Sequence, residues 1–383
     1  MNKKHVLLYK IVRPLVMLFS KICFGYTYEK AKDLPENYIV ISNHVTDFDM
    51  LFVTASFPKQ MYYVASEHVT RMGFLSKIVK FAFDPIIRPK GSSAAATVME
   101  MVRKARKGER VCLFAEGVRS WDGETCPIVP STGKLIKTAG CGLVTYKIVG
   151  GYFASPMWGG ASMRRGYLHG APVHVYTPEQ LKAMTAAEVQ HAIETDLYEN
   201  AYDRQLKNPK RYKGKNLARG LENLLYICPE CGAYDGFESS GNDVRCKHCG
   251  LNFTYNEYGM LLDAPYPTVY AFSKWQEGKL AEDVRCGAVY EAAKARLCAL
   301  TDGEEVFVAE GAVQMSNDML RCGNWEVPMS QITDLAMHGQ RAIVFTAGKQ
   351  YYEMIPEKGS NALKFMLYYV ENKQLEKTKS LVG

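Results

Sequence analysis

YIVISNHVTDFD, residues 38–49, joins a short apolar run to an Asn-His pair and places a carboxylate, Asp49, five residues after His44. The apolar run predicts a buried strand over Tyr38–Ser42, followed by a helix. An imidazole at the end of a strand can take a proton, and a nearby carboxylate can hold its tautomer and stabilise the imidazolium. We therefore interpret His44 as a candidate general base and Asp49 as the group that orients it. The alternative is a helix start, in which Asp47 or Asp49 stabilises the first turn.

The overall composition predicts a large globular protein with more than one domain. With 383 residues, 47% hydrophobic and 23% charged, the chain is long enough for two or three domains. The net charge of +7 suits anionic membrane surfaces or phosphorylated substrates, and it is too diffuse to indicate nucleic acid. Four of the eleven cysteines form two Cys-x-x-Cys pairs, which without an export signal indicates a reducing compartment. We therefore expect the protein in the cytosol or on the cytoplasmic face of a membrane.

The N-terminal segment, residues 1–28, is both basic and apolar. Three basic residues interrupt the apolar residues between Val6 and Tyr28, and the first acidic residue is Glu29. No run of about twenty uninterrupted apolar residues exists, so we expect neither a membrane span nor a signal peptide. We expect a basic amphipathic helix lying in the headgroup layer, in peripheral or interfacial contact with the membrane. A core-facing helix with solvated lysines fits the same pattern.

Strands alternate with helices in the first half of the chain. Ser92–Gly108 shows both helix signals, with Ser at its start and basic residues and Gly at its end. Such alternation predicts an α/β layer architecture, in which ligands gather at strand ends. The other expected strands are 60–65, 85–88, 110–114, 143–149 and 173–176, and the other expected helices are 47–57, 66–83, 133–139 and 178–205.

Polar side chains follow three of these strands. His44 ends one strand, Arg88 ends a second, and Glu116 and Arg119 follow a third. A base and two guanidinium groups at neighbouring strand ends would form a pocket that grips a phosphate ester while deprotonating a group attached to it. Each residue taken singly has a simpler explanation, because surface arginines after strands are common. The combination is what indicates a site.

Two stretches resemble the glycerophospholipid acyltransferase family, whose typical member is 1-acylglycerol-3-phosphate acyltransferase. Residues 43–49 (NHVTDFD) look like the first family block, N-H-x-x-x-x-D. Residues 114–120 (FAEGVRS) resemble the third block, F-P-E-G-T-R-S, with Ala115 for proline and Val118 for threonine. The resemblance covers about residues 1–205.

The second and fourth family blocks are degraded in this chain. Residues 82–88 (AFDPIIR) share only Ile86 and Arg88 with the second block, G-x-I-F-I-x-R. Residues 143–149 (LVTYKIV) lack the proline of the fourth block, V-P-V. These departures leave open a different lysolipid, or another amphiphile, as the acyl acceptor.

The resemblance implies an O-acyltransferase that works at a phospholipid membrane surface. His44 would abstract the proton of an acceptor hydroxyl as its oxygen attacks the thioester of an acyl-CoA or acyl-carrier protein, and Asp49 would hold the imidazole. The acceptor would be a lysophospholipid, above all 1-acylglycerol-3-phosphate, and no metal would take part. The acceptor-binding residues that the resemblance implies are Arg88, Glu116, Gly117 and Arg119.

Two Cys-x-x-Cys pairs in the second half of the chain predict a metal site. The pairs are separated by fourteen residues, and each is followed by glycine (CPECG and CKHCG). Four thiolates in tetrahedral reach are typical of a structural zinc site of the ribbon type, and a site with all four positions filled by protein is not catalytic. Zinc ribbons also bind nucleic acid, but this one lacks a basic and aromatic surface. The expected ligands are Cys228, Cys231, Cys246 and Cys249.

The last part of the chain predicts a helix, a set of short strands and a closing helix. Residues 272–300 show a helical pattern with an Ala-rich centre, and the closing helix is expected over 360–372. Several strands capped by one helix are similar to a pleckstrin-homology-like or GRAM-like barrel. The pattern suits lipid or partner binding, and a plain scaffold equally. The expected strands are 305–309, 312–316, 324–328, 331–336, 342–346 and 350–354.

The fold class expected from the sequence is therefore an α/β acyltransferase domain with a mixed sheet flanked by helices, followed by a zinc ribbon and a small β-rich barrel closed by a helix. A different class of protein is also open: a membrane-bound interaction protein whose acyltransferase domain is silent. The expected division is a membrane-associating segment over 1–28, the acyltransferase domain over 29–205, a basic linker over 206–223, the zinc ribbon over 224–262, a helical connector over 263–300 and the barrel over 301–375.

Overall fold

The computed structural model describes residues 3–66, 83–88, 95–160, 162–301 and 304–382. The chain divides into two compact units. The first comprises Met1–Met157 and Ala161–Gly214, and the second comprises Trp158–Gly160 and Lys215–Gly383.

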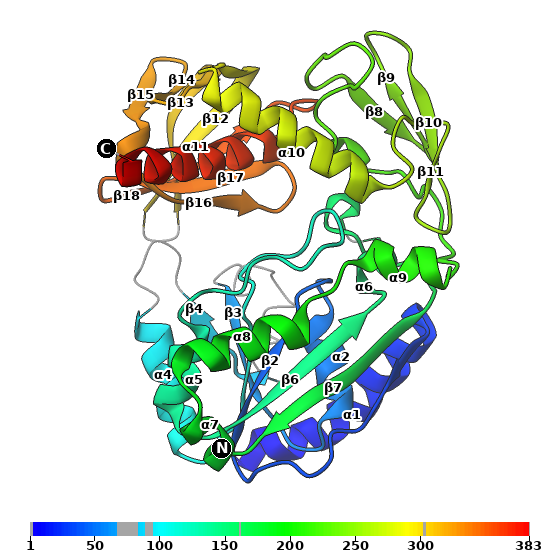
Figure 1. Ribbon diagram of the computed structural model, residues 1–383, viewed down its shortest axis with the longest axis vertical. Helices are drawn as coiled ribbons and strands as arrows, with labels where there is room; N and C mark the ends of the chain where they lie inside the picture. Colours follow the sequence, from blue (N-terminus) through cyan, green and yellow to red (C-terminus); the bar gives the residue numbers. More distant parts are fainter. Residues whose placement is uncertain (1–2, 67–82, 89–94, 161, 302–303, 383) are drawn as a thin grey trace. The chain divides into compact units, whose positions relative to one another are not determined.

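A seven-stranded mixed sheet forms the centre of the first unit, with the strand order β1-β7-β6-β2-β5-β3-β4 (Figure 1). The five strands from β6 to β4 run parallel to one another, and β7 is antiparallel to β6. All five residues of β2 are buried, as expected for a parallel strand covered on both faces. The bounds are β1 Tyr26–Tyr28, β2 Tyr38–Ser42, β3 Tyr62–Ser66, β4 Ile86–Arg88, β5 Val111–Phe114, β6 Gly142–Val149 and β7 Leu168–Tyr176.

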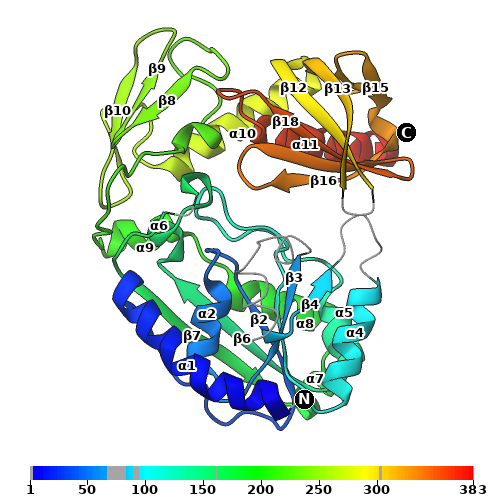
Figure 2. The same cartoon turned by 180° about the vertical axis from the view of Figure 1, so that it is seen from behind.

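Helices pack against both faces of this sheet (Figures 1 and 2). On one face, Ile39 and Ile41 of β2 share a core with apolar side chains of α4, α5 and α8. On the other face lie α1 and α2, and the ring of Phe57 contacts Tyr38 and Tyr146. The helices are α1 Lys3–Phe24, α2 Asp49–Ser56, α4 Ala95–Arg106, α5 Thr132–Ala139, α6 Gly151–Ala154, α7 Pro178–Ala183, α8 Ala186–Leu197 and α9 Ala201–Lys207.

The predicted strands of this unit are confirmed in their order, but β1 and the short helix α6 were not predicted, and one predicted helix differs. A single helix over 178–205 is wrong, because the chain forms three helices there. Thr185 begins α8 with a capping box and Asn200 caps α9, so each side chain satisfies backbone N–H groups of a new helix. The helix predicted over 66–83 falls almost entirely outside the described residues.

Helix α1 has apolar side chains on two opposite sides. On the inner side Tyr9 is buried, its hydroxyl donates to the carbonyl of Phe57 (2.9 Å), and Arg13 donates to the carbonyl of Ala55. The outer side carries five side chains that are each more than half exposed: Leu7, Ile11, Leu15, Leu18 and Ile22. Within the described residues, no helix is long and apolar enough to cross a bilayer.

The second unit begins with a small antiparallel sheet of order β11-β10-β9-β8 that carries the cysteine pairs. The basic linker expected over 206–223 contains the division between the two units, after Gly214. Most of residues 206–216 are exposed, whereas Tyr212 is buried in the first unit and Leu217 and Leu221 are buried in the second. The strands are β8 Phe237–Ser240, β9 Asp243–Cys246, β10 Asn252–Tyr255 and β11 Leu261–Leu262.

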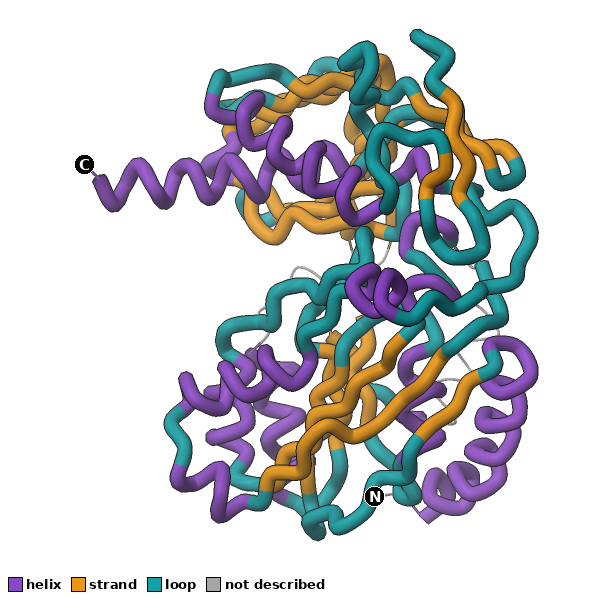
Figure 3. The backbone as a smooth tube through the Cα atoms, turned by 45° about the vertical axis from the view of Figure 1, so that its right-hand side comes forward, coloured by secondary structure: helices purple, strands orange, loops and turns teal. Residues whose placement is uncertain are grey.

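A seven-stranded antiparallel sheet, a half-barrel, forms the rest of the second unit, with the order β15-β14-β13-β12-β18-β17-β16 (Figure 3). One apolar core joins its strands to α10 and α11. The strands are β12 Tyr290–Thr301, β13 Glu304–Met315, β14 Met319–Cys322, β15 Trp325–Pro328, β16 Ile332–His338, β17 Ala342–Ala347 and β18 Gln350–Pro356, and the helices are α10 Val269–Arg285 and α11 Leu363–Val382.

The helix predicted over 272–300 is wrong in its second half. Helix α10 ends at Arg285, and residues 290–301 form β12, which pairs with β13 on one side and β18 on the other. The alanines favour a helix locally, but two neighbouring strands satisfy the backbone of this segment and bury Ala292, Ala295 and Leu297. The helical connector expected over 263–300 therefore belongs half to the large sheet. The strands predicted over 305–309 and 312–316 are one strand, β13, and β14 was not foreseen.

Candidate active site

The side chain of Asn43 fixes the point at which the chain leaves β2. Its amide nitrogen donates to the carbonyl of Ile148 and its amide oxygen accepts from the N–H of Ile148, both at 2.8 Å. Asn43 is buried and thereby continues the pairing of β2 with β6 through its side chain. The next residue, His44, must then turn away from the sheet at its carboxyl edge. The sequence pointed to this pair of residues but not to the role of the amide.

Asp49 is a buried carboxylate at the start of α2 that organises the loop between Asn43 and the helix. It accepts hydrogen bonds from Nδ1 of His44 (2.8 Å), from the backbone N–H groups of Val45 (2.7 Å) and Thr46 (3.0 Å), and from the Thr46 hydroxyl (2.7 Å). Because the Asp49 carboxylate accepts a hydrogen bond at Nδ1 of His44, the imidazole carries its proton on Nδ1 and keeps a lone pair on Nε2. The helix-start alternative is half correct, since Asp49 begins α2, but its carboxylate turns back onto the loop.

Glu116 lies behind His44 and holds two loops together. One carboxylate oxygen accepts the N–H of His44 (2.7 Å) and the other accepts the N–H of Cys126 (2.8 Å). Burial raises the pKa of Glu116 to about 8, although the two backbone donors oppose the shift. Among the described residues, Glu116 does not line the cavity beside His44. Its geometry is that of a positioning group, whereas the resemblance implied a contact with the acceptor.

Arg119 is buried and its terminal nitrogens are already engaged. Nη1 forms an ion pair with Asp47 (2.7 Å), and Nη2 donates to the carbonyls of Ser155 (2.6 Å) and Val45 (3.4 Å). The guanidinium thus ties together the loops that follow β2, β5 and α6. The resemblance placed Arg119 at a substrate phosphate, and in this structure a protein carboxylate, Asp47, occupies that role. No signal in the sequence paired Asp47 with Arg119.

His44, Arg88 and Gly117 border one cavity of about 540 Å³ in the first unit. The ring of His44 stacks on that of Phe114, with 4.8 Å between ring centroids. Arg88 is exposed at the end of β4, and Gly117 adopts a left-handed backbone with open space where a side chain would stand. Most of the remaining wall is apolar, and it includes Val64, Val98, Met101, Leu113, Val129 and Leu135.

This arrangement can deprotonate a hydroxyl beside an apolar hollow. Nε2 of His44 is the basic atom, and Asp49 can stabilise the imidazolium that forms. Of the two arginines expected at the site, Arg88 borders the cavity and can attract an anionic group there. The structure therefore divides the predicted residues into His44, Arg88 and Gly117 at the cavity, and Asp49, Glu116 and Arg119 behind it.

The four predicted cysteine ligands meet in the second unit. All four Sγ atoms lie within 4.8 Å of one another, with 3.7 Å between those of Cys228 and Cys249 and 3.9 Å between those of Cys231 and Cys246. Four sulfurs around one zinc ion at ~2.3 Å would be about 3.8 Å apart, so the cluster fits a tetrahedral ion. The glycine after each pair has the left-handed backbone that closes such a turn.

Comparisons with known proteins identify the chemistry of the first unit. Residues 26–149 match the family described as Acyltransferase. The matched stretch contains the whole constellation around His44, so the chain carries an acyltransferase domain and the protein is an acyltransferase by class. No curated protein sequence matches the chain significantly.

A solved structure similar to this chain is the crystal structure of the 1-acyl-sn-glycerophosphate (LPA) acyltransferase PlsC from Thermotoga maritima. The two chains are 18% identical, with a TM-score of 0.42. The match covers 52% of this chain and 81% of the Thermotoga maritima chain.

The raised pKa of Glu116 predicts that the stability of the first unit depends on pH. The ordinary glutamate pKa is 4.5, whereas burial raises that of Glu116 to about 8. Between these values the folded state holds a proton that the unfolded state has lost, so the free energy of unfolding falls as the pH rises. We expect Glu116→Gln to reduce this slope. The pH dependence of the free energy of unfolding is measured by urea titration between about pH 5 and pH 8, with hydrogen exchange in the strands of the first unit as the readout.

A matched control for this prediction is Glu36→Gln, because Glu36 is exposed. The control should keep the pH dependence of the wild-type protein. An equal slope in the wild-type protein and Glu116→Gln would contradict the role assigned to burial.

Proposed function

We propose that the protein transfers a fatty acyl group from acyl-CoA or acyl-carrier protein to the hydroxyl of a lysophospholipid, with 1-acylglycerol-3-phosphate as the leading acceptor. The observation that carries this proposal is the His44–Asp49 pair at the mouth of an apolar cavity. An acceptor that contributes a hydroxyl needs such a base, and an acyl chain needs such a cavity. The acyltransferase domain match supports the reaction class.

The proposed reaction needs no acyl-enzyme intermediate. Nε2 of His44 takes the hydroxyl proton as the oxygen attacks the thioester carbonyl, and a tetrahedral intermediate forms. The carbon–sulfur bond then breaks, and the imidazolium returns the proton to the leaving thiolate. Asp49 faces the imidazolium and stabilises it, and three further hydrogen bonds hold its carboxylate in place. Holding donor and acceptor together removes much of the barrier.

The cavity beside His44 suits the acyl chain. Its wall is mainly aliphatic, from Val64, Val98 and Met101 on one side to Leu135 on another. Each methylene group that moves from water into such a wall stabilises the complex by about 0.8 kcal/mol. The reacting carbonyl of a chain in this cavity would lie at its His44 end.

The acceptor phosphate, in this proposal, binds to Arg88. Its guanidinium is exposed at the cavity, whereas the nitrogens of Arg119 are held by Asp47 and two carbonyls. A single exposed arginine grips a phosphate less firmly than two would. The same observation favours the second candidate acceptor, a lysolipid or amphiphile without a terminal phosphate.

We further propose that the outer side of α1 docks on the membrane surface that supplies the lipid substrates, on its cytoplasmic face. Five large aliphatic side chains repeat along that side, from Leu7 to Ile22, and each is more than half exposed. Lys10 and Lys21 are exposed on the same helix, and the helix contains no acidic residue. Apolar burial and attraction to anionic headgroups together favour a helix that lies in the interface.

The cysteine cluster is proposed to hold a structural zinc ion, and the half-barrel is proposed to act as a pleckstrin-homology-like or GRAM-like module. The sulfur spacing supports the first proposal. The antiparallel sheet with the long helix α11 supports the second. Zinc here would join the two cysteine-bearing segments, residues 228–231 and 246–249, through its four sulfur ligands.

The first test of the proposed function replaces the general base. His44→Ala should lower the transfer of labelled acyl groups from acyl-CoA to 1-acylglycerol-3-phosphate by about a hundredfold or more, because general bases contribute this much. A matched control exists in the same unit: His174 also bonds a carboxylate, Asp196, through Nδ1 (2.7 Å), but it lies outside the cavity. His174→Ala should keep full activity.

If His44→Ala retains its acyltransferase activity, the result would contradict the proposed mechanism. The same assay with a monoacylglycerol in place of 1-acylglycerol-3-phosphate decides between the two acceptors. Equal rates would count against the phosphate-bearing acceptor and in favour of the second candidate.

The membrane proposal predicts a loss of vesicle binding when charge is placed on the outer side of α1. The double variant Leu15→Glu/Leu18→Glu should bind vesicles containing phosphatidic acid at least about tenfold more weakly, because two aliphatic side chains leave the bilayer surface. Sedimentation with vesicles measures the bound fraction. Leu206→Glu, on an equally exposed leucine of α9, is the control and should bind normally. Equal binding of all three proteins would contradict docking through α1.

The zinc proposal predicts about one zinc ion per chain and a less stable second unit after its removal. Cys231→Ser/Cys249→Ser should lose the ion and lower the free energy of unfolding of this unit by several kcal/mol. Elemental analysis and thermal unfolding measure the two effects. Cys286→Ser, at an exposed cysteine outside the cluster, should change neither. A wild-type protein purified under reducing conditions without any bound metal would contradict the proposal.

A further inference from the structure

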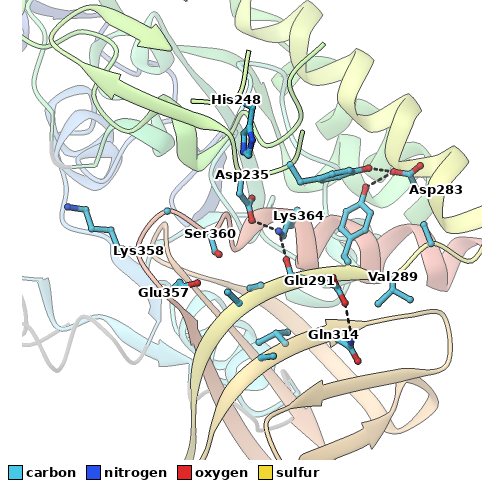
Figure 4. A pocket seen from close by; sticks show the side chains of 18 of the residues that line it. Asp235, His248, Asp283, Val289, Glu291, Gln314, Glu357, Lys358, Ser360 and Lys364 are labelled. Atoms are coloured by element: carbon cyan, nitrogen blue, oxygen red, sulfur yellow. Dashed lines mark hydrogen bonds and ion pairs between the residues drawn. The ribbon is translucent and has the colours of Figure 1, made fainter. Parts of the chain in front are cut away.

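A second hollow, of about 830 Å³, lies within the second unit (Figure 4). Segments far apart in the sequence form its wall: residues 234–235, residues 247–248 beside the second cysteine pair, the beginning of β12 with the end of β13, and residues 357–364. A volume of this size is in the range of sites for small ligands. Neither the acyltransferase match nor the proposed transfer reaction uses it.

The hollow exists because small side chains line one of its sides. Ala288 lies just before β12, Ala292 and Ala293 lie at its beginning, and Ala312 lies beside them on β13. Larger aliphatic residues at these positions would fill the space, as they do elsewhere in the core of this sheet. A fold that needed only a stable junction here would gain by such filling.

A buried lysine lies at the centre of the wall. The side chain of Lys364 is 2% exposed, and its amine forms an ion pair with Asp235 and donates to the carbonyl of Glu291 (2.6 Å), as Figure 4 shows. An ammonium group has three hydrogens, so one remains for a ligand. The ion pair alone would fasten residue 235 to α11, but it does not account for the open space beside it.

Three of the four carboxylates that line the hollow, those of Asp235, Asp283 and Glu291, accept hydrogen bonds from neighbouring groups. Asp235 accepts from Lys364 and from the N–H of Asn361, and Asp283 accepts from the hydroxyls of Tyr234 and Tyr290. Glu291 accepts from the side-chain amide of Gln314 (2.8 Å). Among the described residues, the Glu357 side chain forms no ion pair or hydrogen bond, so it is the one lining carboxylate that opposes an anion in the hollow.

The hydrogen-bond donors of the hollow are in excess. Within the described residues, the side chains of Lys247 and Lys358 form no ion pair, and neither they nor the hydroxyl of Ser360 form a hydrogen bond. Figure 4 places Lys358 at one edge of the hollow and Ser360 closer to its centre. Together with the third hydrogen of Lys364, these groups are hydrogen-bond donors without a protein partner in the described parts of the chain, and most of them are cationic. Such a set recognises an anion.

We propose that this hollow is a second binding site of the protein and that it takes a ligand carrying a phosphate group. Three lysines and a hydroxyl, one from residues 247–248 and three from residues 357–364, match the several oxygens of a phosphate better than the two oxygens of a carboxylate. The phosphate belongs to a small soluble molecule or to a lipid headgroup, and the chemistry of recognition is the same for both. A bound phosphate would link the cysteine-bearing segment to the large sheet and to α11.

The test measures hydrogen exchange of the full chain with and without glycerol 3-phosphate, and with vesicles of phosphatidylcholine alone or with phosphatidic acid. We expect hydrogen exchange at residues 234–235, 247–248 and 357–364 to slow when the phosphate-bearing ligand is present. Glycerol should leave these exchange rates unchanged. This readout is local, so binding to the acyltransferase domain does not affect it. Protection by glycerol 3-phosphate identifies a soluble ligand, and protection only by phosphatidic acid vesicles identifies a headgroup.

Two variants test the site itself. Lys247→Glu reverses a charge at the hollow, and Ala293→Leu fills it without changing any charge; each should weaken binding about tenfold. Lys349→Glu, at an exposed lysine outside the hollow, is the matched control and should bind as the wild-type protein does. Thermal unfolding shows that all three are folded. The absence of protection in every arm, or unchanged affinity in both site variants, would overturn the proposal.

Discussion

A buried carboxylate, Asp49, is the group on which the active-site loop depends. It accepts from four donors within six residues of chain, and one of them is the imidazole of His44. A loop of this length has no strand or helix partner for its backbone, so the carboxylate takes the place of secondary structure. The same carboxylate that shapes the loop also fixes the orientation of the His44 ring. The shape of the loop and the direction of the imidazole therefore depend on one group.

The groups behind His44 show how the rest of the domain supports that loop. Asn43 extends the pairing of β2 with β6, Glu116 holds the backbone of His44, and Arg119 joins three loops through Asp47 and two carbonyls. All are buried polar groups that bond to neighbouring loops, although Nε of Arg119 has no partner among the described residues, and such networks restrict a site to one geometry. Arg88 differs because it stands at the end of an edge strand, where its guanidinium remains exposed.

Local patterns predicted most elements of the fold and failed where tertiary pairing opposed them. The apolar run over Tyr38–Ser42 was recognisable as a strand, because burial on both faces leaves a continuous apolar signal. The Ala-rich stretch of β12 looked helical, and only its two neighbouring strands decide otherwise. The long helix expected over 178–205 breaks at Thr185 and Asn200, whose capping signals were present in the sequence but were not used.

The sequence by itself determined the residue types of both sites: the His-x-x-x-x-Asp spacing places a carboxylate within reach of its imidazole, and two Cys-x-x-Cys pairs place thiolates in pairs. Such short spacings are set by local backbone geometry, so no knowledge of distant contacts is needed. Only the tertiary structure decided which polar residues face the cavity. Arg88 and Arg119 are alike in the sequence, but Asp47 and Ser155 engage one of them and leave the other exposed. Partners supplied from distant segments decide that difference, because a buried guanidinium must be paired while an exposed one remains open to substrate.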